Sequence, residues 1–244
     1  MIVYHQTLAP DFLSPNELDQ LLSIGWYRMH QTIFTTSHLR NDEKYYRVYW
    51  LRYPLAEIRE HPSHRRIRNS NQSFHYAIDD FTEIQPDHEE LYSRYRASID
   101  FQGALSIEQC LFGDNGVERN IYQTKCISVY DHEKLIACGY FDLGKLAGTS
   151  ILHCFDPAYK NKSLGKYMML LTMDYLNLAG FDLYYPGYLV SGIPKMDYKL
   201  FIGKEATQYY EPGSKTWKRF QEGICKAENL TELERLELML AFMA

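Results

Sequence analysis

The order of hydrophobic patterns between residues 120 and 190 most constrains the fold of this chain. Residues 120–143 read as two strands joined in a hairpin, and residues 148–159 form a third strand-like run. Residues 163–181 have apolar side chains at helical spacing, and the short run 182–190 is again strand-like. A hairpin, a strand, a long helix and a strand predict a mixed sheet with a helix packed on it. The side chains expected on the apolar face of that helix are Met169, Leu170, Met173, Leu176 and Leu178.

The first part of the chain opens with a strongly signalled helix. Ser14 is a candidate N-cap, Pro15 occupies the first helical position, Glu17 completes a capping box and Gly25 ends the helix. Aromatic and β-branched runs at 26–36 and 45–53 predict strands, the polar segment 60–71 breaks the pattern, and 86–99 has helical spacing. We place a boundary between residues 86 and 100, which separates a smaller N-terminal α/β region (1–90) from a C-terminal domain (91–244).

Composition excludes several classes of protein. The net charge of −5 argues against a chain that coats nucleic acid over its whole surface, although it permits a local basic patch. The first ten residues lack the pattern of a signal peptide and no apolar run is long enough to span a bilayer, so we expect a cytoplasmic protein. The five cysteines are widely spaced without a C-x-x-C pair. We therefore expect no metal site and buried thiols at Cys126, Cys138 and Cys154. A separate expectation, which follows from the chemistry implied below, is that the protein needs no cofactor.

The predicted order of elements resembles the core of the GNAT acyltransferase fold. That resemblance implies an α/β (α+β) GNAT-like fold with a mixed, mostly antiparallel sheet and packed helices. In ordinary acetyltransferases a glycine-rich turn before the long helix binds coenzyme A, whereas here the turn is YKNKSLGKY with Gly165 alone. A helix N-terminus beside Lys160, Lys162 and Lys166 can still hold a phosphate. In the alternative interpretation, Gly165 only permits close packing and the lysines are solvated.

A closer resemblance rests on four short motifs in the C-terminal half. They are similar to those of the arginyl-tRNA–protein transferases and their bacterial leucyltransferase relatives. The motifs are Phe155-Asp156-Pro157, Ser163-Leu164-Gly165-Lys166-Tyr167, Tyr185-Pro186-Gly187-Tyr188-Leu189-Val190 and Pro194-Lys195-Met196-Asp197-Tyr198-Lys199. Fainter similarity covers LLSIGWYRMHQTIFTT, SHRRIRNSN and EELYSRYRASI. The chain departs from the family where a cysteine cluster is usual, because IFTTSHLRNDEKYYRVYW has no cysteine, and where Ser-Cys has become Gly192-Ile193.

The resemblance implies transfer of an aminoacyl group, of Arg or Leu type, from a charged tRNA to the N-terminal α-amine of a protein, with Asp and Glu as candidate N-termini of an N-degron kind. Two alternatives stay open: a GNAT enzyme that uses another donor such as an acyl-CoA, and an inactive descendant that binds tRNA or peptide. The predicted catalytic residues are Tyr188, Lys195 and Tyr198. The predicted substrate-binding residues are Lys199, Tyr185, Asp156, Ser163, Gly165, Lys166, Arg28, Arg65 and Arg66.

These assignments compete with structural interpretations. The tyrosine-rich stretch from Tyr184 to Tyr210 is unlike a surface loop and unlike a core strand, because it also carries lysines. For Tyr184 and Tyr185 a packed aromatic layer is the preferred interpretation. Arg65 and Arg66 lie in the densest basic cluster of the chain, which either contacts tRNA phosphates or is a solvated surface.

Overall fold

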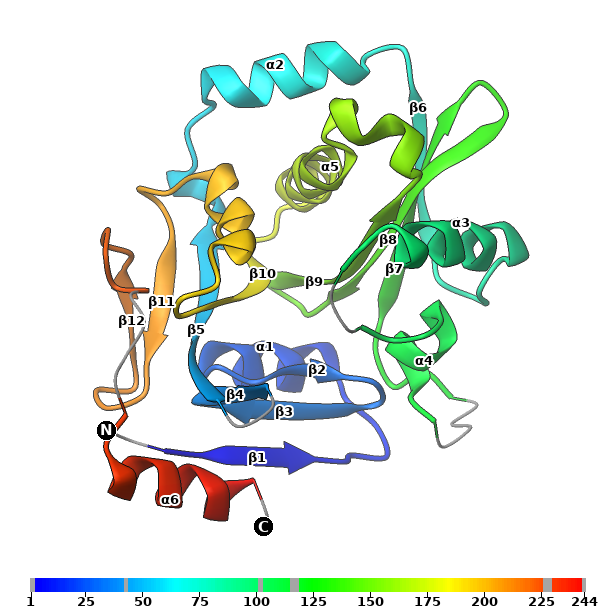
Figure 1. Cartoon of the computed structure of the whole chain (residues 1–244). Helices are drawn as coiled ribbons and strands as arrows, with labels where there is room; N and C mark the ends of the chain where they lie inside the picture. The colour runs from blue at the N-terminus through cyan, green and yellow to red at the C-terminus, as the bar shows by residue number, and fades with distance from the viewer. Residues whose placement is uncertain (1–2, 42–43, 101–102, 115–118, 226–229, 243–244) are drawn as a thin grey trace.

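A large mixed sheet forms the centre of the protein (Figure 1). The computed structural model describes residues 3–41, 44–100, 103–114, 119–225 and 230–242. Within these ranges nine strands form the sheet, in the order β12-β11-β5-β10-β9-β8-β7-β6, with β4 paired to β5 outside that path. Neighbouring strands are antiparallel except β9 and β10, which run parallel. The strands are β4 (His38–Asn41), β5 (Lys44–Pro54), β6 (His75–Asp80), β7 (Thr124–Asp131), β8 (Lys134–Leu143), β9 (Ala147–Phe155), β10 (Leu183–Val190), β11 (Gln208–Glu211) and β12 (Thr216–Arg219).

A smaller three-stranded sheet packs beside β5 and β10. Its order is β1-β3-β2, and its strands are β1 (His5–Leu8), β2 (Tyr27–Met29) and β3 (Thr32–Thr36). Tyr27 and Ile33 from this sheet join Leu18 and Leu22 of helix α1 (Pro15–Ser23) and Trp50 of β5 in one buried cluster. This cluster fixes the small sheet against one half of the large one.

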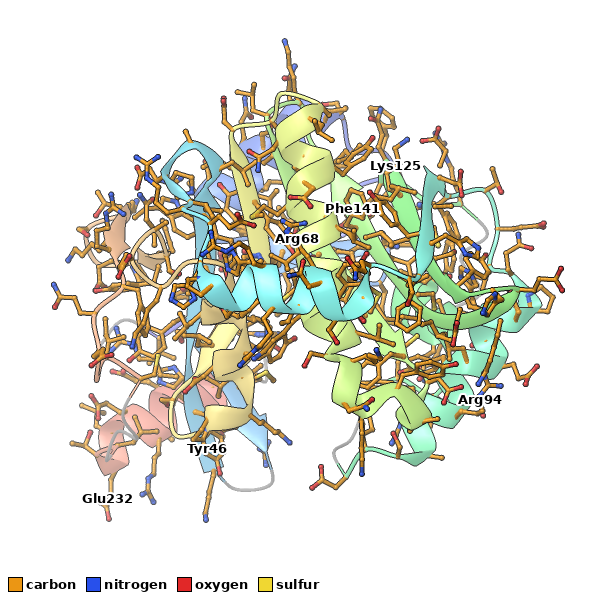
Figure 2. All side chains as sticks on the ribbon, turned by 90° about the horizontal axis from the view of Figure 1, so that it is seen from above. Tyr46, Arg68, Arg94, Lys125, Phe141 and Glu232 are labelled. Carbon is orange, nitrogen blue, oxygen red and sulfur yellow. The ribbon has the colours of Figure 1, made fainter. Side chains whose placement is uncertain are left out.

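Helices cover both faces of the other half of the large sheet. Helix α5 packs on β8 and β9, and α2 crosses over α5, as the view from above shows (Figure 2). Helices α3 and α4 pack on the opposite face through Leu91, Ile107 and Leu111. The helical segments are α2 (Pro62–Asn71), α3 (Pro86–Ala97), α4 (Ile107–Phe112), α5 (Leu164–Leu178), α6 (Glu232–Ala241) and the 3₁₀ turns η1 (Leu55–Glu57), η2 (Pro157–Lys162) and η3 (Pro194–Ile202).

The predicted order of elements between residues 120 and 190 is confirmed. β7 and β8 form the hairpin, β9 follows, α5 packs on the sheet, and β10 returns parallel to β9. The predicted fold class, an α+β protein with a mixed, mostly antiparallel sheet and packed helices, is therefore confirmed. Leu178 is a correction: it is 89% exposed because it is the last residue of α5, whereas the other four predicted apolar positions are buried.

The signals for helix α1 are confirmed in detail. The Ser14 hydroxyl accepts from the backbone N–H of Glu17, and the Glu17 carboxylate accepts from the backbone N–H of Ser14 at 2.8 Å. Pro15 stands at the start of the helix. After the helix Gly25 has φ of +81°, and a Cβ there would lie 2.8 Å from the ring of Tyr210. Both the backbone conformation and the close approach of that ring require glycine.

Two predictions for the N-terminal part are corrected. The run 26–36 is not one strand but two, β2 and β3, because His30 takes a left-handed φ of 56° and turns the chain. The polar segment 60–71 is not an irregular break but contains helix α2. Pro62 sits where a helix tolerates proline, and the His61 ring caps the helix by accepting from the Ser63 N–H at 3.2 Å. Ile67 is buried on the inner face of this helix.

Other expectations have mixed outcomes. Cys138 and Cys154 are buried and their sulfurs lie 3.2 Å apart, while Cys126 is half-buried. No helix within the described residues is long and apolar enough to cross a membrane. Strand β5, from the first half of the chain, lies inside the large sheet between β10 and β11. The division into regions 1–90 and 91–244 stays a prediction. Residues 1–2 and 42–43, which belong to segments interpreted from the sequence, lie outside the described residues.

Candidate functional site

The site begins where β9 and β10 separate. The two strands pair only from Leu183 to Tyr185 on β10, opposite Ala147 to Thr149 on β9. Beyond this point a bulge between Tyr184 and Gly187 shifts the register of β10 against β5. Pro186 has no backbone N–H to offer to a neighbouring strand, and Gly187 has φ of +101°. The later residues of β9 and β10 therefore border an opening in the sheet.

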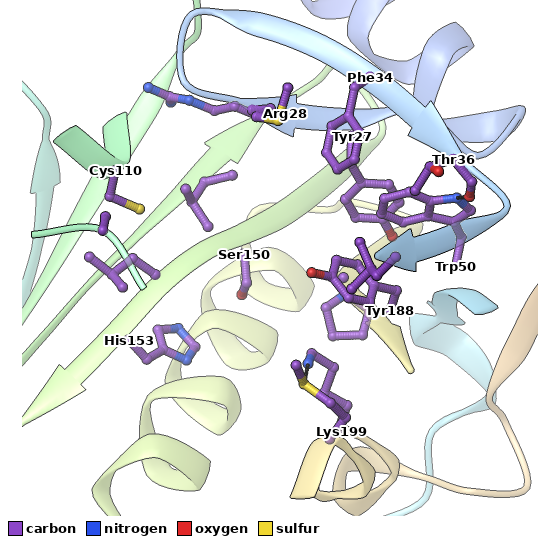
Figure 3. A pocket seen from close by; sticks show the side chains of 18 of the residues that line it. Tyr27, Arg28, Phe34, Thr36, Trp50, Cys110, Ser150, His153, Tyr188 and Lys199 are labelled. Atoms are coloured by element: carbon purple, nitrogen blue, oxygen red, sulfur yellow. Dashed lines mark hydrogen bonds between the residues drawn. The ribbon is translucent and has the colours of Figure 1, made fainter. Parts of the chain in front are cut away.

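A cavity of about 520 Å³ occupies this opening (Figure 3). Its walls come from β9, β10, η3, the small sheet, Trp50 of β5 and Met169 of α5. The volume is in the range of pockets that bind small molecules or the end of a larger ligand. None of the described residues that line it is an aspartate or a glutamate. Segments from both halves of the chain thus build one pocket.

One end of the pocket is a wall of aromatic rings. Tyr27 stacks on Trp50 with ring centres 4.4 Å apart, and Phe34 and Tyr188 meet Trp50 edge to face at 5.4 and 5.1 Å. The Trp50 indole donates to the carbonyl oxygen of Thr36 at 3.1 Å, which fixes its orientation. This wall is suited to an apolar side chain.

The other end of the pocket holds a buried lysine. Lys199 is 9% exposed, and its Nζ lies 3.5 Å from the Met196 sulfur and over the rings of Tyr198 and Tyr188, at 4.8 and 5.7 Å from their centres. Among the described residues no carboxylate lies within ion-pair distance of this ammonium group. Burial lowers the pKa of Lys199 to about 8. The pocket thus contains a desolvated cation that an anionic ligand would stabilise.

Backbone contacts fix the position of Lys199. The Tyr53 hydroxyl donates to the Lys199 carbonyl oxygen, and the His64 ring of α2 bonds the Phe201 carbonyl oxygen at 2.9 Å. On the opposite side a Cβ at Gly187 would lie 3.4 Å from the Lys199 Cε. The bulge in β10 therefore leaves the space through which the lysine side chain runs.

His153 is a pocket residue that the sequence analysis did not identify. It lies on β9, and its side chain points into the same cavity as that of Lys199 (Figure 3). Burial and the nearby Lys199 charge lower the pKa of His153 to about 4. The signal available in the sequence is weak: a histidine between apolar residues of a strand is ordinarily a core residue.

Of the predicted catalytic residues, the structure brings Tyr188 and Tyr198 into the pocket beside Lys199. Burial raises the pKa of Tyr188, and it raises that of Tyr198 to about 12, although Tyr198 is 43% exposed overall. Both hydroxyls therefore keep their protons and act as hydrogen-bond donors at neutral pH. Lys195 is exposed on η3 and is not among the residues that line the pocket.

The side chains of Tyr185 and Arg28 are held by contacts with other residues of the protein. Tyr185 is buried on the other side of β10, with Tyr27 and Trp217 edge to face against its ring at 6.1 and 5.6 Å. The Arg28 guanidinium is held by Asp142 at 2.9 Å and by the carbonyl oxygen of Leu111 at 2.8 Å. These contacts explain why both side chains are buried without a substrate. Their roles in substrate binding stay predictions.

The predicted residues of the turn before α5 lie outside the pocket lining. Asp156 pairs with Lys134 at 2.8 Å and caps η2 by accepting from the Ala158 N–H at 2.9 Å. Ser163 has φ of 54° at the start of α5, and a Cβ on Gly165 would lie 3.7 Å from the Phe155 ring. The Lys166 ammonium lies 5.1 Å from the centre of the Phe201 ring, which connects this turn to η3. Nothing in this geometry tests their assignment to substrate binding.

Arg65 and Arg66 lie exposed on α2. Arg68, the third arginine of this helix, is half-buried and forms an ion pair with Asp174 of α5, with a hydrogen bond of 2.8 Å from its Nη2. The outward charge of the helix is therefore smaller than the sequence suggests, since Arg68 is neutralised by a residue far away in the chain. Lys162 of η2 extends the basic surface, with its Nζ bonded to the Ser70 carbonyl oxygen at 3.0 Å.

Within the described residues no group of three or more His, Cys, Asp or Glu side chains has an arrangement that could hold a metal ion. The expectation of metal-free chemistry stays a prediction.

The fold and the pocket define an α+β protein with a cavity between two separating strands. The model of a protein family described as arginine-tRNA-protein transferase, C terminus, matches residues 87–207, which contain β9, β10 and η3. The chain belongs to this family of aminoacyl-tRNA–protein transferases, in which the bacterial relatives are leucyltransferases.

Two relatives indicate how distant the similarity is. An aspartate/glutamate leucyltransferase of Shewanella sp. strain MR-4 is 27% identical over 199 residues, which are 79% of this chain and 78% of that protein. One of Vibrio cholerae is 23% identical over 196 residues, 79% of this chain and 80% of that protein. Among solved structures, the C-terminal domain of a putative lysylphosphatidylglycerol synthetase from Agrobacterium fabrum matches with a TM-score of 0.44 and 13% identity, over 64% of this chain and 52% of that chain.

Proposed function

We propose that this protein transfers a leucyl group from leucyl-tRNA to the α-amine of a protein that begins with aspartate or glutamate. One observation carries the proposal: the pocket joins an aromatic wall to the buried, carboxylate-free Lys199, and its described lining contains no acidic residue. The names of the curated relatives, aspartate/glutamate leucyltransferases, support it.

The aromatic wall supports a leucyl donor over an arginyl donor. A leucyl side chain gains free energy when it is buried against Tyr27, Trp50 and Tyr188. An arginyl guanidinium in the same place would lose its water without finding a carboxylate, and burying an unpaired charge is costly. Its charge would also be repelled by Lys199.

Lys199 supports an acidic acceptor. The carboxylate of an N-terminal aspartate or glutamate would restore the ion pair that the lysine lacks in the free protein. A neutral N-terminal residue such as glutamine or alanine would leave the ammonium group buried and unpaired. Discrimination between glutamate and glutamine then follows from the cost of that unpaired charge.

The chemistry requires orientation and a stabilised intermediate. The acceptor's neutral α-amine attacks the ester carbonyl carbon, an amide bond forms, the bond to the ribose oxygen breaks, and the amine proton is passed to that oxygen. Holding the two reactants together lowers the barrier, and hydroxyl donors stabilise the tetrahedral oxyanion. Tyr188 and Tyr198 are placed in the pocket as protonated donors.

The test compares donors and acceptors directly. Peptides that differ only in a first residue of Glu, Asp, Gln or Ala are incubated with labelled leucyl-tRNA or arginyl-tRNA, and transferred label is counted. We expect label on the Glu and Asp peptides from leucyl-tRNA. Preferred transfer from arginyl-tRNA, or equal transfer to the Gln peptide, would reject the proposal. No transfer under any condition would favour the inactive descendant.

Helix α2 is the surface that we assign to the tRNA. Arg65→Ala combined with Arg66→Ala is expected to weaken tRNA binding about tenfold or more at low salt, because contacts to tRNA phosphates would be lost. Each lost phosphate contact should also reduce the slope of log affinity against log salt concentration by about 0.9. Both side chains are exposed, so the melting temperature should change little. Filter binding across a salt titration measures the effect.

A matched control removes two charges elsewhere. Lys215→Ala combined with Lys218→Ala takes the same charge from exposed positions at the β11–β12 edge. This control should bind tRNA within about twofold of the wild type if position matters more than total charge. Equal losses in the two double variants would show that α2 is only a solvated surface.

A further inference from the structure

The ring of His153 packs directly against the backbone of a neighbouring strand. His153 pairs with Gly139 of β8 in the antiparallel register. A Cβ on Gly139 would lie 2.5 Å from the His153 Cδ2 and 3.4 Å from its Nε2. The imidazole therefore occupies the space that a side chain at position 139 would fill. The glycine thus allows the ring to lie close over β8 at the wall of the pocket.

Among the residues that the structure describes, none is a hydrogen-bond partner of the His153 ring. Its Nε2 is buried. A buried polar atom without a partner costs about 1–3 kcal/mol. An orphaned N–H is rarer than an orphaned acceptor, which favours the tautomer with its proton on Nδ1. Unlike Nε2, Nδ1 is not fully buried, so the N–H of this tautomer is accessible to a ligand in the cavity.

The electrostatic surroundings keep this ring neutral. Burial, followed by the Lys199 charge, holds the pKa of His153 near 4, so at neutral pH the ring carries one N–H and no charge. A group with this pKa is a poor acceptor of a proton from an α-ammonium group, because an efficient base has a pKa nearer the working pH. A role in binding therefore fits the ring better than a role as general base.

We infer that His153 is a second residue that binds the acceptor: its Nδ1–H donates a hydrogen bond to the side-chain carboxylate that Lys199 attracts. Two donors, an ammonium group from η3 and an imidazole N–H from β9, then hold the two oxygens of one carboxylate between the separated strands. The inference rests on the proposed function and adds to it the specificity residue opposite Lys199.

Three substitutions separate this role from the others. His153→Phe keeps a flat ring and removes both nitrogens. His153→Asn places an amide N–H near the position of Nδ1, whereas His153→Gln places one near Nε2. The acceptor KM and kcat are measured with a peptide whose N-terminal residue is Glu, at saturating leucyl-tRNA. The KM for leucyl-tRNA and the melting temperature are measured as well. Wild-type turnover is measured first, so that absence of transfer counts against the proposed function alone.

We expect His153→Phe and His153→Gln to raise the acceptor KM about tenfold or more, since a hydrogen bond to a charged group is worth about 1.5–3 kcal/mol. His153→Asn should stay within about threefold of the wild type, and kcat should change little in all three variants. The inference is wrong if the Asn and Gln variants have equal KM, if kcat falls while the acceptor KM is unchanged, or if only the KM for leucyl-tRNA rises. If His153→Phe does not fold, the comparison of Asn with Gln still decides.

Discussion

Lys199→Met is expected to reduce kcat/KM for a Glu-terminated peptide by about a hundredfold, because truncating one partner of a buried charge pair costs about 2–5 kcal/mol. Methionine keeps the length and most of the volume of the side chain that runs past Gly187. The loss should be mainly in the acceptor KM, and the KM for leucyl-tRNA should change little. Steady-state kinetics with each substrate varied in turn would measure this.

Lys195→Met is the matched control, because Lys195 lies on the same 3₁₀ segment but is exposed and outside the pocket lining. If kcat/KM fell a hundredfold in Lys195→Met and changed little in Lys199→Met, Lys199 would not be the lysine of the site. The sequence-based prediction that Lys195 is catalytic would then be supported. Equal transfer by Lys199→Met and the wild type would remove the lysine from acceptor recognition.

The pH dependence gives a second measurement of Lys199. Its pKa near 8 means that the ammonium charge is lost as the pH rises through that value. The ratio of kcat/KM for Glu-terminated and Gln-terminated peptides should therefore fall above pH 8. The acceptor's α-amine titrates alike in both peptides, so the ratio isolates the lysine. Lys199→Met should give a low ratio that does not depend on pH.

The stability of the ligand-free protein should rise over the pH range in which the preference for Glu over Gln falls. Unfolded, the lysine has its ordinary pKa of 10.5, so between about pH 8 and 10.5 the unfolded chain binds more protons than the folded one. The stability of the ligand-free wild type therefore rises across this window, and below pH 8 the full penalty of about 3 kcal/mol is present. Lys199→Met removes the penalty, so the variant should be at least as stable as the wild type at pH 7.

Arg28→Met is expected to lower the free energy of unfolding by about 3–5 kcal/mol, since breaking a buried pair leaves an uncompensated charge. Arg28 and Asp142 are both almost fully buried, and Thr124 completes their network with a hydrogen bond of 2.6 Å to Asp142. Burial raises the pKa of Asp142, although Arg28 and Thr124 oppose that shift. The melting temperature should fall by about 10 °C in thermal unfolding monitored by circular dichroism.

Arg28→Met combined with Asp142→Asn is the control, and it should recover much of the lost stability because the orphaned carboxylate is gone. This experiment also tests the sequence-based assignment of Arg28 to substrate binding. A variant that is as stable as the wild type but has a raised substrate KM would support that assignment and contradict the structural interpretation.

Local patterns were enough to predict several elements. The capping box of Ser14 and Glu17, the hairpin near Asp131 and the length of α5 depend on residues a few positions apart, and such interactions are the same in any tertiary context. The motif from Pro194 to Lys199 likewise indicated a candidate site segment before its fold was known. Local reasoning was wrong at Pro62, where polarity was interpreted as a break although a proline there begins a helix.

The pocket depended on contacts that no local pattern contains. Lys195 and Lys199 look equivalent in the sequence, yet only Lys199 is buried, because the bulge at Gly187 opens a path for it. His153 reads as a core residue until its pairing with Gly139 and its missing partner are known. Thus the sequence by itself determined helix α1, the order of elements between residues 120 and 190, and the family. The tertiary structure decided which polar groups lose water without gaining a partner, since desolvation depends on residues distant in the chain.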